Sequence, residues 1–218
     1  MHGDPAGRPF IGGALILALV SGATVGWAPV IGWVSASLFV ALGAFFVFFF
    51  RDPDRLSPTD ANAVLSPADG GVLVAGAALS ESAPPGAWQQ ISIFLSPMDV
   101  HVNRVPVSGR VTNVRYIAGR FLPAYRHDAG SANERSEIWI DHGGQSIVAR
   151  QIVGFLARRV VCRAQVGADV RAGDRFGIMK FGSRMDVFLP MDATLAVTVG
   201  QVVRGGETII AMLHSGKR

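Results

Sequence analysis

The stretch Gly177-Ile-Met-Lys-Phe-Gly-Ser-Arg-Met-Asp-Val-Phe-Leu-Pro190 places a Gly-Ser pair inside an apolar run that is typical of a strand. Glycine has no Cβ, so its backbone can adopt strained conformations and its carbonyl is open to attack. Ser183 can therefore attack the carbonyl of Gly182, the residue before it. A Gly-Ser pair is far more often an ordinary turn, so the surrounding sequence has to decide between the two interpretations.

Two similar segments flank this stretch, Val166–Asp174 before it and Val199–Glu207 after it. Each reads Val, Gly, a short gap, Val, Arg, Gly and then an acidic residue. Each segment predicts a hairpin in which glycine accommodates a positive φ. We therefore expect quasi-repeated hairpins on both sides of Ser183.

The chain from Ala63 onward consists of short runs rich in Val and Ile, separated by Gly, Pro, Asp or Asn. This pattern predicts an all-β sandwich or barrel. The predicted strands are Gly71–Ala77, Gln90–Leu95, Gly109–Tyr116, Glu137–His142, Ser146–Phe155 and Arg158–Ala164. Glu81–Gly86 contains two prolines and predicts a loop, and no helix of ordinary length is predicted after Phe50.

The N-terminal part contains no charged residue between Arg8 and Arg51. A single helix of about 42 residues is about 63 Å long, twice the roughly 30 Å of a bilayer core. Two spans fit better, about Phe10–Trp27 and Ile31–Phe50, with a turn near Ala28-Pro29 because proline disfavours helix continuation. The predicted fold class is therefore mainly β, a barrel-sandwich-like domain preceded by an N-terminal hydrophobic helical hairpin.

Arginines flank the two spans, with Arg8 before the first and Arg51 and Arg55 after the second. By the positive-inside tendency, both ends of the hairpin lie in the cytoplasm. A signal peptide with Ile11–Val20 as its apolar region is the competing interpretation. It leaves the second apolar stretch, which ends in Phe45-Phe-Val-Phe-Phe-Phe50, unexplained. A shallow re-entrant insertion is a further alternative, because Gly and Ser are frequent in the first half.

Composition sets further bounds on the protein. The 218 residues suffice for one sizeable core and an appendage, and we place the boundary after the polar stop Arg51–Arg55, giving domains 1–55 and 56–218. The formal charge of +4 suits an anionic lipid surface. The sequence contains no basic run interleaved with aromatic residues, so it does not indicate binding to nucleic acid. Cys162 is the only cysteine, so an intrachain disulfide and a cysteine-built zinc site are excluded. No metal site is predicted.

Four polar clusters stand out from the apolar β pattern, namely Ser66–Gly70, Leu95–Pro106, Ala132–Arg135 and the Gly-Ser pair. The first is also a good turn sequence, the third an ordinary solvated loop, and a single strand histidine such as His101 is usually structural. An acid, a histidine and a serine can nevertheless form a triad in any chain order, since triads are defined by geometry. Spacing alone does not show that Asp69, His101 and Ser183 meet.

Five motifs, taken together, carry a resemblance to a known family. They are Phe49-Phe-Arg-Asp-Pro-Asp-Arg55, Ser66-Pro-Ala-Asp-Gly70, Phe94-Leu-Ser-Pro-Met-Asp-Val-His-Val-Asn-Arg104, Asn133-Glu-Arg135 and Lys180-Phe-Gly-Ser-Arg184. Their order and content resemble the short type of phosphatidylserine decarboxylase proenzyme. Each motif is modest, but five in the family's order are highly specific, and the resemblance covers essentially the whole chain.

The resemblance implies an enzyme that makes its own pyruvoyl cofactor. Ser183 would attack the Gly182 carbonyl, and elimination would split the chain into a β chain of residues 1–182 and an α chain of residues 183–218. The pyruvoyl group derived from Ser183 would form a Schiff base with phosphatidylserine and act as an electron sink while CO2 departs, which yields phosphatidylethanolamine. The implied location is the cell membrane, with the catalytic domain on the cytoplasmic face. A homo-oligomer is left open.

Residue roles follow from the same resemblance. His101 resembles the family's general base towards Ser183, and Asp69 the acid that orients it. Longer family members carry a second histidine three positions later, where this chain has Arg104, which puts the assignment of the base to His101 in question. Arg104 is instead a candidate for binding the substrate phosphate or carboxylate.

Four further residues were weighed as site residues. Asn133 and Arg135 are substrate-binding candidates because they belong to one of the five motifs. His127 and His142 are weaker candidates, for which a structural role is the favoured interpretation.

Two other functional classes fit parts of the sequence. Lys180 between two glycine-bearing hairpins resembles the modified lysine of biotinyl or lipoyl carrier domains, although Phe181 stands where the carrier pattern has methionine. A related fold does not fix function. A non-catalytic membrane-anchored β module is the third class, and it leaves the ordered motifs unexplained.

Overall fold

The computed structural model describes residues 2–79, 83–155, 160–180 and 182–214. The chain divides into two compact units, Met1–Asp54 and Arg55–Arg218. Each unit is described by itself below.

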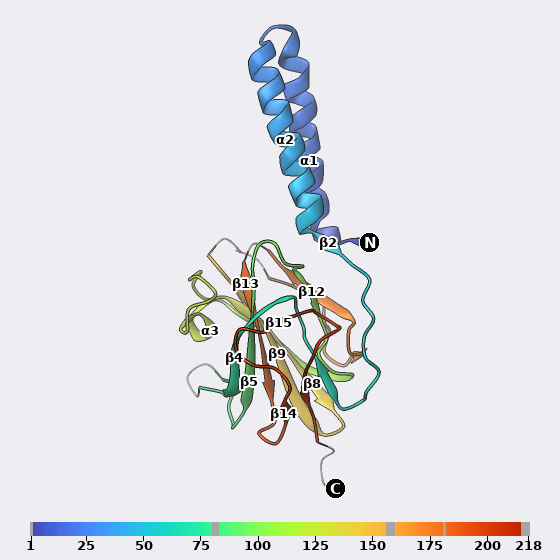
Figure 1. Ribbon diagram of the computed structural model, residues 1–218, viewed down its shortest axis with the longest axis vertical. Coiled ribbons are helices and arrows are strands. Elements are labelled where there is room, and N and C mark those ends of the chain that lie inside the picture. The colour runs from blue at the N-terminus through green and yellow to red at the C-terminus, as the bar shows by residue number, and fades with distance from the viewer. Residues whose placement is uncertain (1, 80–82, 156–159, 181, 215–218) are drawn as a thin grey trace. The chain divides into compact units, whose positions relative to one another are not determined.

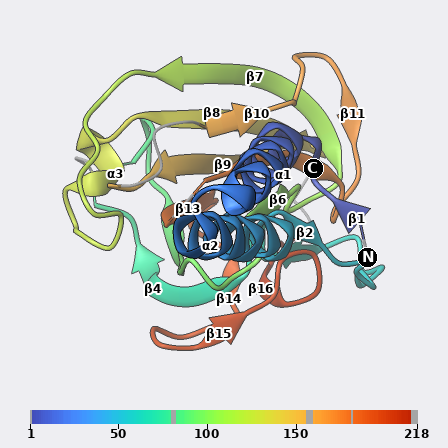
Figure 2. The same cartoon turned by 90° about the horizontal axis from the view of Figure 1, so that it is seen from above.

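The N-terminal unit is a pair of apolar helices, α1 (Arg8–Ala23) and α2 (Pro29–Phe49), which lie side by side in Figures 1 and 2. Short 3-10 turns precede and follow α1 (Pro5–Gly7 and Thr24–Gly26), and β1 (His2–Gly3) pairs with β2 (Arg51–Asp52). Small residues allow the close approach of the helices, since a Cβ on Gly43 would lie 3.7 Å from Ala14 Cβ. Both helices are long and apolar enough to cross a membrane. The predicted hydrophobic hairpin is confirmed.

The second unit is built on an eight-stranded antiparallel sheet that curls into a half-barrel (Figures 1 and 2). Its strand order is β11-β7-β8-β9-β13-β5-β4-β15. The six long strands are β4 (Gly70–Ala77), β5 (Gln89–Leu95), β7 (Gly109–Ile117), β8 (Arg135–His142), β9 (Gln145–Val153) and β13 (Ser183–Leu189), and the edge strands are β11 (Asp169–Val170) and β15 (Val202–Val203). The predicted mainly β fold is confirmed.

Two small three-stranded sheets accompany the large one. The first has the order β10-β12-β6, with β10 (Val160–Cys162), β12 (Arg175–Met179) and β6 (Val102–Arg104). The second has the order β14-β16-β3, with β14 (Thr194–Leu195), β16 (Ile209–Met212) and β3 (Ala63–Leu65). A single helical turn, α3 (Ala129–Ala132), precedes β8.

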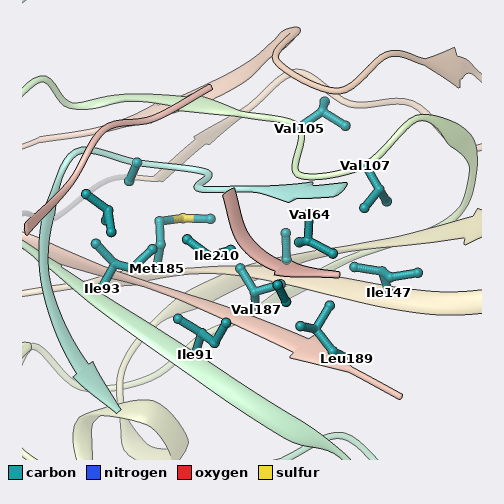
Figure 3. Close-up of a cluster of buried hydrophobic side chains, with 14 of the residues drawn as sticks. Val64, Ile91, Ile93, Val105, Val107, Ile147, Met185, Val187, Leu189 and Ile210 are labelled. Atoms are coloured by element: carbon teal, nitrogen blue, oxygen red, sulfur yellow. The ribbon is translucent and has the colours of Figure 1, made fainter. Parts of the chain in front are cut away.

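The core lies on one face of the large sheet. Successive residues of a strand point to opposite faces, so Met185, Val187 and Leu189 of β13 share the core face with Ile91 and Ile93 of β5. Figure 3 shows these side chains meeting residues of the small sheets and loops. The intervening residues of β13 point to the other face.

The alternating pattern located the long strands well and the short ones poorly. β4, β5, β7 and β8 match their predicted ranges within two residues at either end. The predicted strand Ser146–Phe155 agrees equally well with β9, which runs from Gln145 to Val153. Of Arg158–Ala164, only Val160–Cys162 forms a strand, and residues 158–159 lie outside the described residues, as do 81–82 of the predicted loop.

The two similar segments form equivalent hairpin loops, each of which joins an antiparallel pair of strands. The first joins the antiparallel pair β10 and β12, and the second joins β14 and β16. The middle of each loop leaves its pair and adds an edge strand to the large sheet, β11 beside β7 and β15 beside β4. Four glycines take positive φ at matching places: Gly167 (87°), Gly173 (88°), Gly200 (90°) and Gly206 (76°).

Candidate active site

The Gly-Ser pair lies at the start of a central strand. Ser183 is the first residue of β13, between β5 and β9, and pairs with Leu95 and Val153. Gly182 has a φ of +75°, a conformation that favours glycine. Ser183 is fully buried, and its Oγ has no hydrogen-bond partner among the residues described. A buried hydroxyl left without a partner costs about 1–3 kcal/mol, so it indicates a functional group.

His101 is buried beside this pair, just before β6. Its Nε2 accepts a long hydrogen bond from the backbone N–H of Gly182 at 3.4 Å, and its Nδ1 lies 2.9 Å from the carbonyl oxygen of Asp99. A carbonyl only accepts, so the ring proton is assigned to Nδ1, and the lone pair of Nε2 accepts from the Gly182 N–H. The structure therefore brings a proton acceptor to the predicted cleavage site.

Asp69 is held elsewhere, in the turn before β4. Its carboxylate accepts hydrogen bonds from Arg55 Nη2 at 2.8 and 3.1 Å and from the Gly205 nitrogen at 2.7 Å. Arg55 also pairs with Glu207 at 3.2 Å. Within the described chain, the hydrogen bonds of Asp69 go to Arg55 and Gly205, and none joins it to His101.

Arg104 lies at the two equivalent loops. Its Nη1 donates to the Gly173 carbonyl at 3.0 Å, and a Cβ on Gly206 would lie 2.7 Å from Arg104 Cδ. Residues three apart in an extended segment point to opposite sides, which separates Arg104 from His101. The guanidinium is buried between the loops.

Asn133 ties a loop to the strand next to Ser183. Its side chain is fully buried and accepts from the Leu122 nitrogen at 3.0 Å. It donates to the carbonyls of Leu122 and Val153, both at 2.8 Å. Because Val153 pairs with Ser183, Asn133 fixes the loop against the site.

Arg135 supports the same loop from the first position of β8. Its Nη1 donates to the carbonyls of Ser131 at 2.7 Å and Asn133 at 3.2 Å, and its Nε lies 3.8 Å from Glu137. Partial burial, together with the positive charge of Arg150, lowers the pKa of Arg135. Its hydrogen bonds therefore secure the turn of α3.

An apolar pocket of about 280 Å³ borders Gly182. Among the described residues its lining carries no charged side chain, and it consists of Phe94, Pro97, Pro123, Ala124, Tyr125, Phe155 and Gly182. Its loop wall, Pro123–Tyr125, directly follows Leu122, which Asn133 holds. The pocket can take a small, largely apolar group beside Gly182.

A buried ion pair supports the site from the opposite face of β13. Arg184 binds both carboxylate oxygens of Asp186, at 2.6 and 3.0 Å, and donates to Ser92 Oγ at 3.0 Å. It also reaches the Arg126 carbonyl at 3.4 Å, in the loop that walls the pocket. The residue after Ser183 thus anchors both the strand and the loop.

Several of these residues were missed from the sequence. Arg184 belongs to the motif Lys180–Arg184. Its spacing of two residues from Asp186 on a predicted strand puts both side chains on one face, which was the available signal for an ion pair. The loop wall of the pocket gave no signal beyond the nearby His127, which is exposed.

His142 binds the Ser108 carbonyl at 2.7 Å, in keeping with a structural role. Among the described residues, no group of three or more His, Cys, Asp or Glu is placed to hold a metal.

A mainly β domain that buries the serine of a Gly-Ser pair beside a histidine has the arrangement predicted for a proenzyme. The family model for phosphatidylserine decarboxylase matches residues 42–211. Three similar proteins are each named a phosphatidylserine decarboxylase proenzyme. That of Chlorobium phaeobacteroides is 42% identical over 199 residues, covering 90% of this chain and 92% of the relative. That of Geotalea daltonii is 41% identical over 208 residues (94% of each chain).

The third relative, from Mycobacterium avium, is 42% identical over 217 residues, covering 96% of this chain and 85% of the relative. The chain therefore belongs to the phosphatidylserine decarboxylase family. Membership favours this class over a carrier domain modified on Lys180 and over a non-catalytic module.

Proposed function

We propose that this protein converts phosphatidylserine to phosphatidylethanolamine and CO2 after cleaving itself between Gly182 and Ser183. The observation that carries the proposal is the buried Ser183 hydroxyl, without a hydrogen-bond partner among the described residues, in a chain of this family. The positive φ of Gly182 and the nearby His101 imidazole support the same site.

Self-cleavage is proposed to proceed through an ester and then through dehydroalanine. Ser183 Oγ gives its proton to a general base and attacks the Gly182 carbonyl carbon, the Gly182–Ser183 C–N bond breaks, and the Ser183 nitrogen takes up that proton, which leaves an ester. Loss of the Ser183 Cα proton then expels the Gly182 carboxylate and leaves dehydroalanine. Addition of water and release of ammonia convert dehydroalanine to a pyruvoyl group, on an α chain of residues 183–218 beside a β chain of residues 1–182.

His101 is proposed as the general base for the first step. Its Nδ1 proton is engaged by the Asp99 carbonyl, and its Nε2 lone pair lies at the scissile segment. A positioned base of this kind contributes roughly 10²- to 10⁴-fold to a rate. The orienting role expected for Asp69 passes in this proposal to the Asp99 carbonyl, because the hydrogen bonds of Asp69 secure Arg55 and Gly205.

The pyruvoyl group, once formed, supplies an electron sink for the carbanion left by decarboxylation. The pocket borders Gly182, and its described lining residues carry no charged side chain. Asn133 and Arg135 support the loop wall of this pocket, and Arg104 supports the equivalent loops. All three candidates are therefore proposed to act by positioning rather than by touching the substrate.

The helical hairpin is proposed to tether the enzyme to the bilayer that holds its substrate. Both helices are long and apolar enough to span. Arg8 at the start of α1 and Arg51 after α2 favour a cytoplasmic location for both ends. The catalytic unit then works on the cytoplasmic face.

The intact mass of the purified protein tests this function. We expect two fragments split after Gly182, with the α chain blocked at its N-terminus, and we expect Ser183→Ala to remain one inactive chain. A single chain carrying an adduct on Lys180 would support a carrier instead. A single uncleaved chain in an active preparation would overturn the proposed mechanism.

A further inference from the structure

The residue after β9, Gly154, lies against the carbonyl of the bond that is proposed to break. A Cβ built on Gly154 would lie 2.2 Å from the Gly182 oxygen and 3.1 Å from the Gly182 carbon. Real Cβ atoms do not come this close to backbone, so one of the two groups has to move. Gly154 is not among the glycines with positive φ. The backbone conformation of Gly154 therefore does not require glycine. The space occupied by the Gly182 carbonyl does require it.

Two consecutive residues at the end of β9, Val153 and Gly154, thus lie next to Ser183 and Gly182, the two residues joined by the reacting bond. Val153 pairs with Ser183 in the β9–β13 ladder, which fixes the residue that carries the nucleophile. Gly154 borders the carbonyl oxygen one position earlier. The remaining side of Gly154 is also filled, because its Cβ would lie 3.4 Å from Ala124 Cβ. An added methyl group has no open space to turn into.

We propose that Gly154 is a positioning residue for self-cleavage, whose bare Cα seats the Gly182 carbonyl oxygen so that the carbonyl carbon meets Ser183 Oγ. This inference rests on the proposed function. Attack requires a defined approach to the carbonyl carbon, and a misplacement of about 1 Å can cost roughly 10²-fold in rate. Gly154→Ala pushes the oxygen away from its seat and turns the carbonyl relative to Ser183.

The chain offers a matched control in Gly109, the first residue of β7. A Cβ on Gly109 would lie 2.2 Å from the Asp141 carbonyl oxygen, and Gly109 also lacks a positive φ. Gly109→Ala therefore creates the same kind of clash with a backbone carbonyl, in the β7–β8 pair instead of at Gly182. Any general effect of crowding a sheet glycine should appear in both variants.

The test follows fragment formation in the full-length protein and in both variants by intact mass and gel separation. Circular dichroism measures the folded fraction of each protein, and the cleavage rate is divided by that fraction. We expect Gly154→Ala to cleave roughly 10²-fold more slowly, and Gly109→Ala to cleave at the wild-type rate despite a similar loss of thermal stability. Hydroxylamine gives a second readout, because it captures the ester as a Gly182 hydroxamate. Hydroxamate formation should fall in Gly154→Ala by the same factor, which assigns the defect to the first step.

Each other outcome counts against the inference. Gly154→Ala cleaving within a few-fold of wild type, or both variants slowed alike, would overturn it and leave the proposed function standing. The same holds if Gly154→Ala stays unfolded at every temperature at which Gly109→Ala folds, since Gly154 would then serve folding. A wild-type chain that never cleaves would overturn the proposed function and this inference with it.

Discussion

Asp69 and Arg55 form an ion pair, with Asp69 Oδ2 2.8 Å from Arg55 Nη2. The Arg55 side chain is only 7% exposed, and the same carboxylate accepts from the Gly205 nitrogen at 2.7 Å. Asp69 therefore joins the start of the catalytic unit to the loop that carries β15. This setting separates two roles for the acid, one in stability and one in the chemistry of Ser183.

Asp69→Asn should lower the free energy of unfolding by about 2 kcal/mol, because a mostly buried guanidinium loses a charged partner. Asparagine keeps an acceptor for Gly205, so the ion pair alone is removed. Urea unfolding in a Ser183→Ala background, where every chain is uncleaved, measures the loss. Glu207→Gln, which removes the other Arg55 partner, is the control. Unchanged stability with a cleavage rate reduced a hundredfold would instead make Asp69 a partner of His101.

His101→Gln should slow self-cleavage by roughly 10²- to 10⁴-fold, the range expected for loss of a positioned general base. The physical reason is that Nε2, which lies 3.4 Å from the Gly182 nitrogen, is replaced by an amide that accepts protons poorly. Timed gels of newly made protein follow the two fragments.

A second histidine provides the control for that experiment. His142→Gln changes a ring at the end of β8 that binds the Ser108 carbonyl, so cleavage should be unaffected. If His101→Gln matches it, the base must be another group. Decarboxylation by any cleaved fraction then shows whether His101 also serves the second reaction.

The sequence predicted what depends on local pattern. Apolar residues without charges marked the two helices, and alternation of Val and Ile marked the long strands, because burial on one face enforces a period of two. The pairing of strands that are distant in the sequence could not be predicted from local pattern. The glycines of the two similar segments indicated turns, but nothing local showed that residues 169–170 and 202–203 add to opposite edges of the large sheet.

The candidate site divides in the same way. Ser183 and His101 were found through motifs, and the structure places them near one another. Asp69 belonged to a motif of equal quality, yet its hydrogen bonds go to Arg55 and Gly205. Only the fold decides which of several polar side chains share a pocket, since each choice of partner depends on residues far away in sequence.

Asn133→Ala should lower the free energy of unfolding by about 3 kcal/mol, at about 1 kcal/mol for each of its lost hydrogen bonds. The same change frees the loop wall of the pocket, so decarboxylation should fall with stability. Asn113→Ala, at an exposed position of β7, is the matched control and should change neither. A raised KM at unchanged stability would show that Asn133 contacts the substrate instead.

Acid should loosen the pocket loop through Arg126 and Asp128. A hydrogen bond from Arg126 lowers the pKa of Asp128 below its ordinary value of 3.8. The folded pKa is the depressed one, so the contribution is full at neutral pH and is lost as the pH falls through that lower value. An NMR titration of the Asp128 carboxyl carbon checks the sign. Arg126→Gln should return the midpoint towards 3.8, and a midpoint above that value in the wild type would contradict the assignment.

Deletion of residues 2–50 should impair decarboxylation on bilayers far more than decarboxylation of a short-chain, soluble phosphatidylserine. The two apolar helices raise the concentration of the enzyme at the surface where the diacyl substrate resides, and such tethering changes rates by roughly tenfold or more. The catalytic unit has its own core, so self-cleavage in the truncated chain should continue and serves as the internal control. Equal loss on both substrates, with cleavage intact, would mean that the helices support the catalytic unit directly and do not act as a tether.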